Sequence, residues 1–386
     1  RRNTKSLKYD FAEKRGMPKD LLPLWVADMD FKTSSYVQDA LAKQVEHGIF
    51  GYSDTLTPYF EIVRSWMKRH HDWDVEEDWL VKTPGIVFAL AMAVRAFTEP
   101  GDAVLIQQPV YYPFSEVISD NGRKIVSSDL YAGEDNRYHI DFEDFEQKIR
   151  DNQVKLFFLC NPHNPVARVW TREELTRMGE ICQKYQVKVV SDEIHADFVF
   201  KGKHQVFAAI SKEFADFTIT CTSPSKTFNL AGMMISNVII RDEGLKEIWL
   251  GRHYNFDNPL SIAAAQAAYE KGEPWLEELR AYLDENFRFT GEYLKEHLPK
   301  AKYRVSEATY LAWVDLNAYF EPDEHLPLFF AYKAGVLLEG GNMFVQNSDG
   351  FIRLNLACPK ATLAEGLRRI CEAVNTKHTE KYLGEK

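Results

Sequence analysis

The chain has 386 residues, of which 45% are hydrophobic and 27% are charged. This composition is typical of globular proteins and argues against extensive disorder. At about 150 residues per domain, the length predicts about two or three domains. The net charge of −10, from 47 Lys and Arg against 57 Asp and Glu, argues against a nucleic-acid-binding protein, because such proteins need a basic face.

The sequence lacks the patterns expected of secreted, membrane or zinc proteins. The first ten residues contain no apolar run like that of a signal peptide. The longest apolar run, residues 86–94, is too short to cross a bilayer. The five cysteines form no CxxC pair, so neither a disulfide framework nor a metal site is expected. We therefore expect a cytoplasmic protein with no membrane segment.

Short strand-like segments alternate with longer helical patterns through the middle of the chain. A Thr171-Arg-Glu-Glu174 sequence, typical of a capping box, predicts a helix over residues 171–185. Strands that alternate with helices indicate an α/β fold with a mostly parallel sheet. The strand candidates are residues 103–107, 124–127, 155–160, 187–191, 218–222 and 237–240.

The last hundred residues have a different pattern. A helical segment over residues 275–298 precedes strand candidates at 308–316, 335–338 and 350–355, which indicates a smaller α+β domain. We expect a large domain over residues 48–283. Residues 1–47 and 284–386 are then expected to form the small domain, with residues 21–31 in an N-terminal arm.

Three strand candidates are followed by polar groups with useful chemistry. Asn164 follows the segment that ends at residue 160, Asp192 follows the next, and Lys226 follows the strand candidate at 218–222. Ligands of open α/β sheets bind beyond the carboxyl ends of the strands. We therefore expect an amide, a carboxylate and an amine to gather at one edge of the sheet. Taken singly, an Asp at a strand end is more often a helix N-cap, and a lone Lys is usually solvated.

Gly85 precedes an apolar helical run. A glycine at the start of a helix allows backbone N–H groups to approach an anion, which the helix dipole also favours. A simple turn before a buried helix explains this element equally well when it is judged alone. No dinucleotide-binding, P-loop, zinc-protease or serine-hydrolase motif is found in the sequence.

Five motifs in order resemble those of pyridoxal 5′-phosphate enzymes of fold type I. They are Trp25-Val-Ala-Asp-Met-Asp-Phe31, Cys160-Asn-Pro-His-Asn-Pro165, Ser191-Asp-Glu-Ile-His195, Ser223-Pro-Ser-Lys226-Thr-Phe-Asn-Leu-Ala-Gly232 and Phe351-Ile-Arg-Leu-Asn355. More narrowly, the chain resembles the MalY/PatB family of cystathionine β-lyases, or C–S lyases. The resemblance runs from about Trp25 to Pro359. It implies a transferase-like fold with a large cofactor-binding domain.

The resemblance implies a role for each residue at the reacting centre. Lys226 binds the cofactor through its amine and then acts as the base on Cα–H, which requires a lowered pKa. Asp192 pairs with the pyridine nitrogen and keeps it protonated. Asn164 donates to the 3′-oxygen of the ring, and Tyr111 stacks on the ring face. His195 is expected near the same oxygen, with no assigned role beyond a contact.

The cofactor phosphate and the substrate receive the remaining residues. The resemblance places the phosphate at the backbone N–H groups of Ile86 and Val87 and the hydroxyls of Ser223 and Ser225. Tyr52 matches a residue that reaches the phosphate from a neighbouring subunit, which implies a homodimer with shared sites. Arg353 matches the clamp for the substrate α-carboxylate, and Asn164 and Ala27 are expected to contact the substrate as well.

Three positions depart from the usual pattern. Ala167 stands near the Asn-Pro-x-Asn-Pro motif, where a glycine is common; a positive φ there would cost Ala about 1 kcal/mol. Met234 replaces a basic residue that many relatives place near the phosphate. Residues 344–349 are not the glycine-rich stretch usual before the Arg353 strand, which affects the expected substrate range.

Three functions remain open at the level of sequence. The first is α,β-elimination from cystathionine or a similar S-substituted cysteine, giving pyruvate, ammonia and a thiol. The second is an aminotransferase of class I/II, which uses the same Lys226. The third is a regulatory protein that keeps the cofactor cavity but acts through a partner. The intact set of Lys226, Asp192, Asn164 and Arg353 argues against the third.

Overall fold

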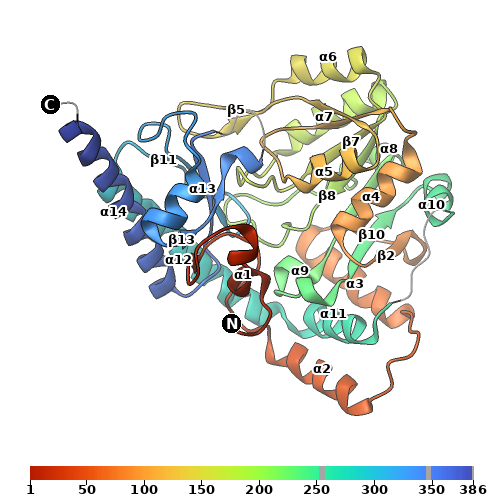
Figure 1. Cartoon of the computed structure of the whole chain (residues 1–386). Helices are drawn as coiled ribbons and strands as arrows, with labels where there is room; N and C mark the ends of the chain where they lie inside the picture. Colours follow the sequence, from red (N-terminus) through yellow and green to blue (C-terminus); the bar gives the residue numbers. More distant parts are fainter. Residues whose placement is uncertain (252–256, 345–348, 385–386) are drawn as a thin grey trace.

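The computed structural model describes residues 1–251, 257–344 and 349–384, and in the last helix the side chains only as far as Lys377. Within these residues a seven-stranded sheet lies at the centre of the larger part of the molecule (Figure 1). In spatial order its strands are β2 (Leu80–Thr83), β10 (Ser236–Ile240), β9 (Thr218–Thr222), β8 (Lys188–Asp192), β7 (Leu156–Cys160), β3 (Ala103–Ile106) and β4 (Lys124–Ser127).

The sheet is mostly parallel, as the sequence predicts. The neighbouring strands from β4 through β3, β7 and β8 to β9 all run in the same direction. Strand β10 runs antiparallel to both β9 and β2. Neither the direction of β10 nor the existence of β2 was predicted, because an apolar run does not reveal which way its neighbour runs.

Helices cover both faces of this sheet, because successive side chains of its central strands point to opposite sides. In β7, Phe158 packs against α4 and α5 on one face, whereas Phe157 packs against α6 and α7 on the other. The helices on the first face are α4 (Ile86–Phe97), α5 (Pro113–Asp120) and α10 (Glu243–Leu250). Those on the second are α6 (Phe142–Asn152), α7 (Arg172–Lys184) and α8 (Lys212–Ala215).

Helix α7 begins where the sequence predicts. The Thr171 hydroxyl accepts a hydrogen bond from the backbone N–H of Glu174 at 3.2 Å. The Glu174 carboxylate in turn accepts one from the backbone N–H of Thr171 at 2.8 Å. This reciprocal pair is a capping box.

The C-terminal part contains a second, antiparallel sheet. Its order is β11 (Lys302–Tyr303), β12 (Leu311–Asp315), β15 (Phe351–Asn355) and β14 (Glu339–Gly340). The long helices α12 (Glu273–His297) and α14 (Lys360–Gly384) belong to the same region (Figure 1). The domain boundary expected at residue 283 falls inside α12, a continuous helix. The division into 48–283 and the flanking segments therefore stays a prediction.

The N-terminal arm contacts both parts of the molecule (Figure 1). Strand β1 (Leu22–Pro23) pairs in parallel with β13 (Val336–Leu337) of the C-terminal part. The Asn355 side chain donates to the carbonyls of Val26 and Asp28, and the Asn229 side chain from the other part donates to that of Met29. The arm is thereby held between the two parts.

Shorter elements and further helices complete the described chain. Helix α2 packs on α11 at one end of the molecule (Figure 1). The remaining elements are α1 (Leu7–Asp10), α2 (Ser35–His47), α3 (Thr57–His71), β5 (Tyr131–Ala132), β6 (Tyr138–His139), α9 (Pro224–Thr227), α11 (Pro259–Lys271) and α13 (Leu326–Phe329). None of the helices in the described ranges combines the length and the apolar character that a membrane crossing requires.

Candidate active site

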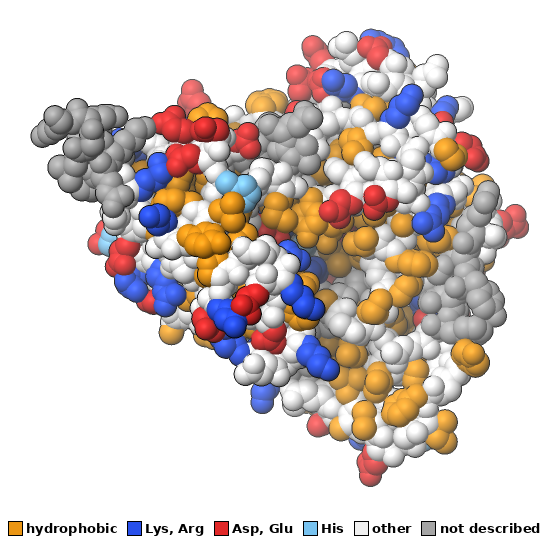
Figure 2. Space-filling model, in the orientation of Figure 1, with side chains coloured by type: hydrophobic (Ala, Val, Ile, Leu, Met, Phe, Trp, Pro, Cys, Tyr) orange, Lys and Arg blue, Asp and Glu red, His pale blue; other side chains and the backbone are white. Residues whose placement is uncertain are grey.

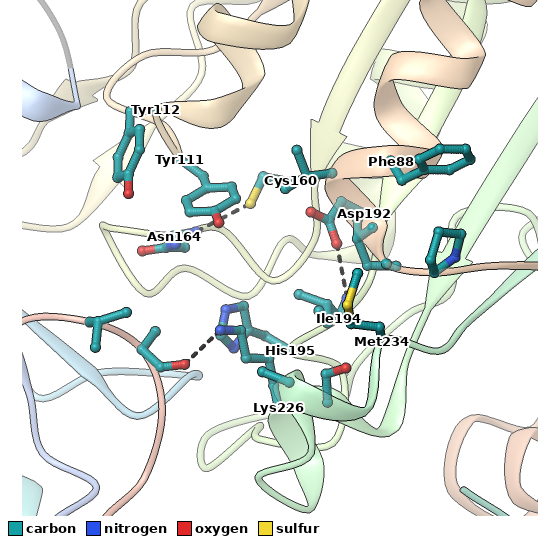
Figure 3. Close-up of a pocket in the computed structure, with 18 of the residues that line it drawn as sticks. Phe88, Tyr111, Tyr112, Cys160, Asn164, Asp192, Ile194, His195, Lys226 and Met234 are labelled. Carbon is teal, nitrogen blue, oxygen red and sulfur yellow. Dashed lines mark hydrogen bonds between the residues drawn. The ribbon is translucent and has the colours of Figure 1, made fainter. Parts of the chain in front are cut away.

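Three polar side chains meet at one edge of the large sheet (Figure 3). Asp192 is the last residue of β8, Asn164 lies in the loop after β7, and Lys226 lies in the short helix α9 that follows β9. Strands β7, β8 and β9 are neighbours that run in parallel, so their carboxyl ends lie side by side. The structure thus brings the amide, the carboxylate and the amine to one place.

A cavity of about 360 Å³ opens at this edge, within the size range of small-molecule sites. The molecule is visibly hollowed there, beside the N-terminal arm (Figure 2). Most residues that the sequence singled out line it: Ala27, Ile86, Val87, Tyr111, Asn164, Asp192, His195, Ser225, Lys226 and Arg353. Ser223 and Tyr52 do not.

Lys226 is held at the cavity by the N-terminal arm. Its Nζ donates a hydrogen bond to the carbonyl oxygen of Ala27 at 2.6 Å. Burial lowers the pKa of this amine from 10.5 to about 8, and the positive charge of Arg353 acts in the same direction. About a tenth of the amine is then neutral at pH 7, far more than for an ordinary lysine, which makes Lys226 suited to act as a nucleophile and as a base.

Asp192 is a buried carboxyl group that lacks a close cation among the described residues. Its Oδ1 accepts a hydrogen bond from the backbone N–H of Ile194 at 3.2 Å. Burial raises its pKa from 3.8 to about 7, and the positive charge of Lys226 only partly opposes this shift. A ligand that brings a positive charge to Asp192, such as a protonated ring nitrogen, would stabilise its ionised form.

His195 lines the cavity beside Lys226 (Figure 3). Burial lowers the pKa of its ring well below the ordinary value, and the charges of Lys226 and Arg353 add to the effect. The imidazole is therefore neutral at physiological pH. Its Nδ1 is buried without a hydrogen-bond partner in the described part of the chain, which leaves one polar atom to be satisfied by a ligand or water.

The opposite wall is formed by an aromatic side chain and a helix start. The Tyr111 ring lies near Asn164 (Figure 3). The backbone N–H of Tyr111 donates a hydrogen bond to the backbone carbonyl of Asn164 at 3.1 Å. Helix α4 begins after Gly85, so the backbone N–H groups of its first turn, including Ile86 and Val87, lie at the cavity. Such a helix start favours the binding of an anion such as phosphate.

The two serines expected at the phosphate occupy different positions. Ser225 lines the cavity. Ser223 lies behind it: its hydroxyl donates to the carbonyl of Ile235 at 2.8 Å and accepts from the backbone N–H of Ser225 at 3.1 Å. This hydroxyl caps α9 and supports Ser225, and the expected contact of Ser223 with the phosphate stays a prediction.

Arg353 is buried in β15 and held by three partners. Its Nη1 donates to the Asn164 Oδ1 at 3.0 Å, and its Nη2 donates to the Trp25 carbonyl at 3.4 Å. Nη2 also forms an ion pair with Glu339. The Arg353 Nε is buried with no partner among the described residues. A planar guanidinium can bind a carboxylate through two parallel hydrogen bonds.

Sequence reasoning missed two acidic residues at this site. Glu339 lines the cavity, but it belongs to none of the recognised sequence motifs. It meets Arg353 only because β14 pairs with β15. Asp197 lies behind Lys226 and accepts a hydrogen bond from the Thr227 hydroxyl at 2.6 Å. Only its position two residues after His195 in the sequence could have indicated that Asp197 lies near the site.

The three departures from the usual pattern fall at different places in the structure. Ala167 has a φ of 54°, in the region that favours glycine. Met234 lines the cavity and is 62% exposed. Residues 345–348, which make up most of the third departure, lie outside the described residues.

Tyr52 lies outside the cavity of its own chain. It occupies the segment between α2 and α3, and it is 90% exposed. Neighbouring hydrophobic side chains on this segment are exposed as well, including Ile49, Phe50 and Leu56. Hydrophobic side chains gather over this lower end of the molecule near α2 and α11 (Figure 2).

The fold and the cavity are those of a known class of proteins. Residues 19–370 match the family described as aminotransferase class I and II, and the chain belongs to this family. A curated relative, the cystathionine beta-lyase PatB of Bacillus subtilis, is 44% identical over 97% of this chain and 98% of that protein.

Solved structures of related proteins have the same fold. The pyridoxal-phosphate-bound C–S lyase from Staphylococcus hominis has a TM-score of 0.92 and 39% identity, covering 97% of each chain. Cystalysin from Treponema denticola, whose structure contains pyridoxal 5′-phosphate, has a TM-score of 0.93 and 36% identity, again over 97% of each chain.

Proposed function

We propose that this protein is a pyridoxal-phosphate-dependent C–S β-lyase. It cleaves an S-substituted cysteine such as cystathionine to pyruvate, ammonia and a thiol. The observation that carries the proposal is the 44% identity to a cystathionine β-lyase over 97% of the chain. The arrangement of Lys226, Asp192 and Arg353 around one cavity supports it.

The residues fit the cofactor. Asp192 is a buried carboxyl group with a raised pKa, and a cationic ring nitrogen beside it would stabilise its ionised form. Lys226 is an amine with a lowered pKa. The Tyr111 ring supplies an apolar face, and Asn164 and His195 supply polar atoms for the ring oxygen. The first turn of α4, with Ile86 and Val87, and the Ser225 hydroxyl would hold the phosphate.

The substrate is oriented by Arg353, whose guanidinium binds the α-carboxylate, with Asn164 and Ala27 beside it. Bound pyridoxal phosphate supplies an electron sink for the negative charge that develops at Cα. The Lys226 amine accepts the proton from Cα, and Asp192 keeps a proton on the ring nitrogen. The C–S bond at Cβ then breaks, its electron pair leaves on sulfur, and the remaining enamine takes up water to give pyruvate and ammonia.

An aminotransferase is the second candidate, and the family to which the chain belongs favours it directly. The two activities share the loss of the Cα proton to Lys226. They differ in the next step, where the lyase loses a thiolate from Cβ, whereas the aminotransferase passes the amino group to a 2-oxo acid. The residues at the reacting centre are common to both.

We also propose that the active form is a cytoplasmic homodimer in which Tyr52 completes the phosphate site of the partner subunit. The exposure of Tyr52 and of the apolar side chains Ile49, Phe50 and Leu56 supports a covered surface at this end of the molecule. Two-fold dimers are also the most frequent assemblies of soluble proteins.

One assay separates the candidates. The loaded protein is incubated with cystathionine, and separately with an amino acid and a 2-oxo acid, with Lys226→Ala as the inactive control. Pyruvate and ammonia from cystathionine alone support the lyase. Exchange of the amino group without pyruvate supports the aminotransferase. Neither product from the parent protein would contradict both, and would favour a regulatory role.

A further inference from the structure

Glu339 is a buried carboxylate in the cavity wall to which the proposed reaction assigns no task. It is 3% exposed and lines the cavity. Its side chain forms an ion pair with the guanidinium of Arg353, the residue that would bind the substrate α-carboxylate. A carboxylate built into the site therefore already engages the cation that the substrate needs.

The backbone fixes this pairing. Glu339 lies in β14 and Arg353 in β15, and the two residues are directly opposite each other in the antiparallel ladder. Side chains of directly opposed residues lie close together on the same face of the sheet. Strand pairing therefore keeps the backbone of Glu339 opposite that of Arg353.

The charges around the cavity are balanced. Among the described residues that line it, the charged side chains are the cations Lys226 and Arg353 and the carboxylates Asp192 and Glu339. A substrate α-carboxylate must share Arg353 with Glu339. A second anionic group on the substrate would find no further cation in this lining, and would approach the Glu339 carboxylate in a site of low polarity, where like charges repel strongly.

Glu339 must be ionised to act in this way. Burial raises its pKa above the ordinary value of 4.5, and the positive charges of Arg353, Arg15 and Lys226 oppose that rise only in part. Arg15 precedes the N-terminal arm in the sequence, and its guanidinium lies over the Trp25 ring, 4.1 Å from the ring centroid. The ion pair with Arg353 itself favours the charged form.

We propose that Glu339 is a specificity-determining residue that makes the enzyme select cysteine thioethers whose leaving group carries no net negative charge. The inference rests on the proposed lyase function and narrows its substrate class. Zwitterionic and neutral leaving groups are accepted. Thioethers whose leaving group carries a carboxylate that no ammonium group balances, and dicarboxylic amino acids, are rejected.

A matched pair of substrates tests the proposal. S-carbamoylmethyl-L-cysteine and S-carboxymethyl-L-cysteine have the same shape and differ by one negative charge. We expect the parent kcat/KM to favour the neutral amide at least about tenfold, which corresponds to about 1.4 kcal/mol. Glu339→Gln should reduce that ratio about tenfold, whereas Glu339→Asp, which keeps the charge, should retain most of it. Comparing ratios between variants cancels the different reactivity of the two leaving thiols.

Binding supplies a second measurement that does not depend on turnover. Dissociation constants of the same two compounds are measured by calorimetry on the non-reacting Lys226→Ala protein, with and without Glu339→Gln. The same preference for the amide, lost in the double variant, supports the proposal. This parental preference also tests the inference if Glu339→Gln fails to fold.

Two results would overturn the inference. The first is a parental preference for the carboxylate, or none at all. The second is an equal loss for both compounds in Glu339→Gln, which would mean that Glu339 only orients Arg353. If the parent cleaves neither these thioethers nor cystathionine, the lyase function fails, and the calorimetric ratio still decides whether Glu339 selects by charge.

Discussion

The Asp197 carboxylate accepts a hydrogen bond of 2.6 Å from the hydroxyl of Thr227, the residue next to Lys226. Its other oxygen lies 2.9 Å from the Nε2 of His71. Burial alone would raise the pKa of Asp197, but the hydrogen bonds from His71 and Thr227 and the charge of His71 lower it to about 2. An ionised carboxylate thus anchors α9, and with it the proposed base.

Replacing this anchor should displace Lys226. Asp197→Ala leaves His71 and Thr227 without their buried partner, so we expect a loss of roughly 3 kcal/mol in the free energy of unfolding. Because Asp197 does not touch the cavity, kcat should fall at least about tenfold while KM changes little. Denaturation and steady-state kinetics measure the two effects. Asp197→Asn, which keeps an acceptor for Thr227, should recover part of kcat; equal kcat in the parent and Asp197→Ala would exclude a positioning role.

The lowered pKa of Lys226 has a consequence for cofactor capture. The neutral amine is the reactive form, and its pKa is about 8 instead of 10.5. The rate at which the cofactor-free protein binds added pyridoxal phosphate should therefore rise with pH and reach half of its maximum near pH 8. Stopped-flow absorbance measures this rate.

Arg353 provides the control for that profile. Its positive charge helps to lower the pKa of Lys226, so Arg353→Gln should move the midpoint to higher pH. A midpoint near 10.5 in the parent protein would show that Lys226 behaves as an ordinary exposed lysine.

The proposed shared site can be tested by mixing two impaired variants. If Tyr52 serves the partner subunit, a mixed dimer of Tyr52→Ala and Lys226→Ala contains one site with both lesions and one intact site. Random exchange makes about half of the dimers mixed, so activity should return to about a quarter of the parental value. Turnover is measured before and after subunit exchange.

The mixing experiment needs two controls. Mass spectrometry verifies that mixed dimers have formed, and each variant alone sets the background. Mixed dimers without recovered activity would assign Tyr52 to its own chain.

The capping box of α7 predicts a change in stability without a change in chemistry. Thr171→Ala removes the acceptor for the Glu174 backbone N–H and should cost about 1 kcal/mol. Thr171→Ser keeps the hydroxyl and serves as the control. Thermal denaturation should show a lower Tm for the alanine variant alone, with parental kcat/KM in both. A normal Tm for Thr171→Ala would contradict the assigned cap.

Local signals in the sequence predicted the parts of the structure that depend on neighbours along the chain. The start of α7 is set by Thr171 and Glu174, three residues apart. Asn164, Asp192 and Lys226 meet because parallel strands end at the same edge of a sheet. Both are consequences of rules that need no knowledge of distant contacts.

The features that the sequence did not reveal depend on pairings between distant segments. Glu339 acquires its place only through the register of β14 against β15. Ser223 could not be separated from Ser225, because the acceptor that occupies its hydroxyl, the Ile235 carbonyl, belongs to a later segment. The antiparallel direction of β10 likewise depends on how the chain returns to the sheet.

The N-terminal arm holds the two cations of the cavity through its main chain. The Trp25 carbonyl accepts from Arg353, and the Ala27 carbonyl accepts from Lys226. Every amino acid carries the same carbonyl group, so a point substitution in this segment leaves both acceptors in place. Amino-acid substitutions in the arm should therefore leave these two hydrogen bonds intact. A deletion that shortens the arm would remove both of them.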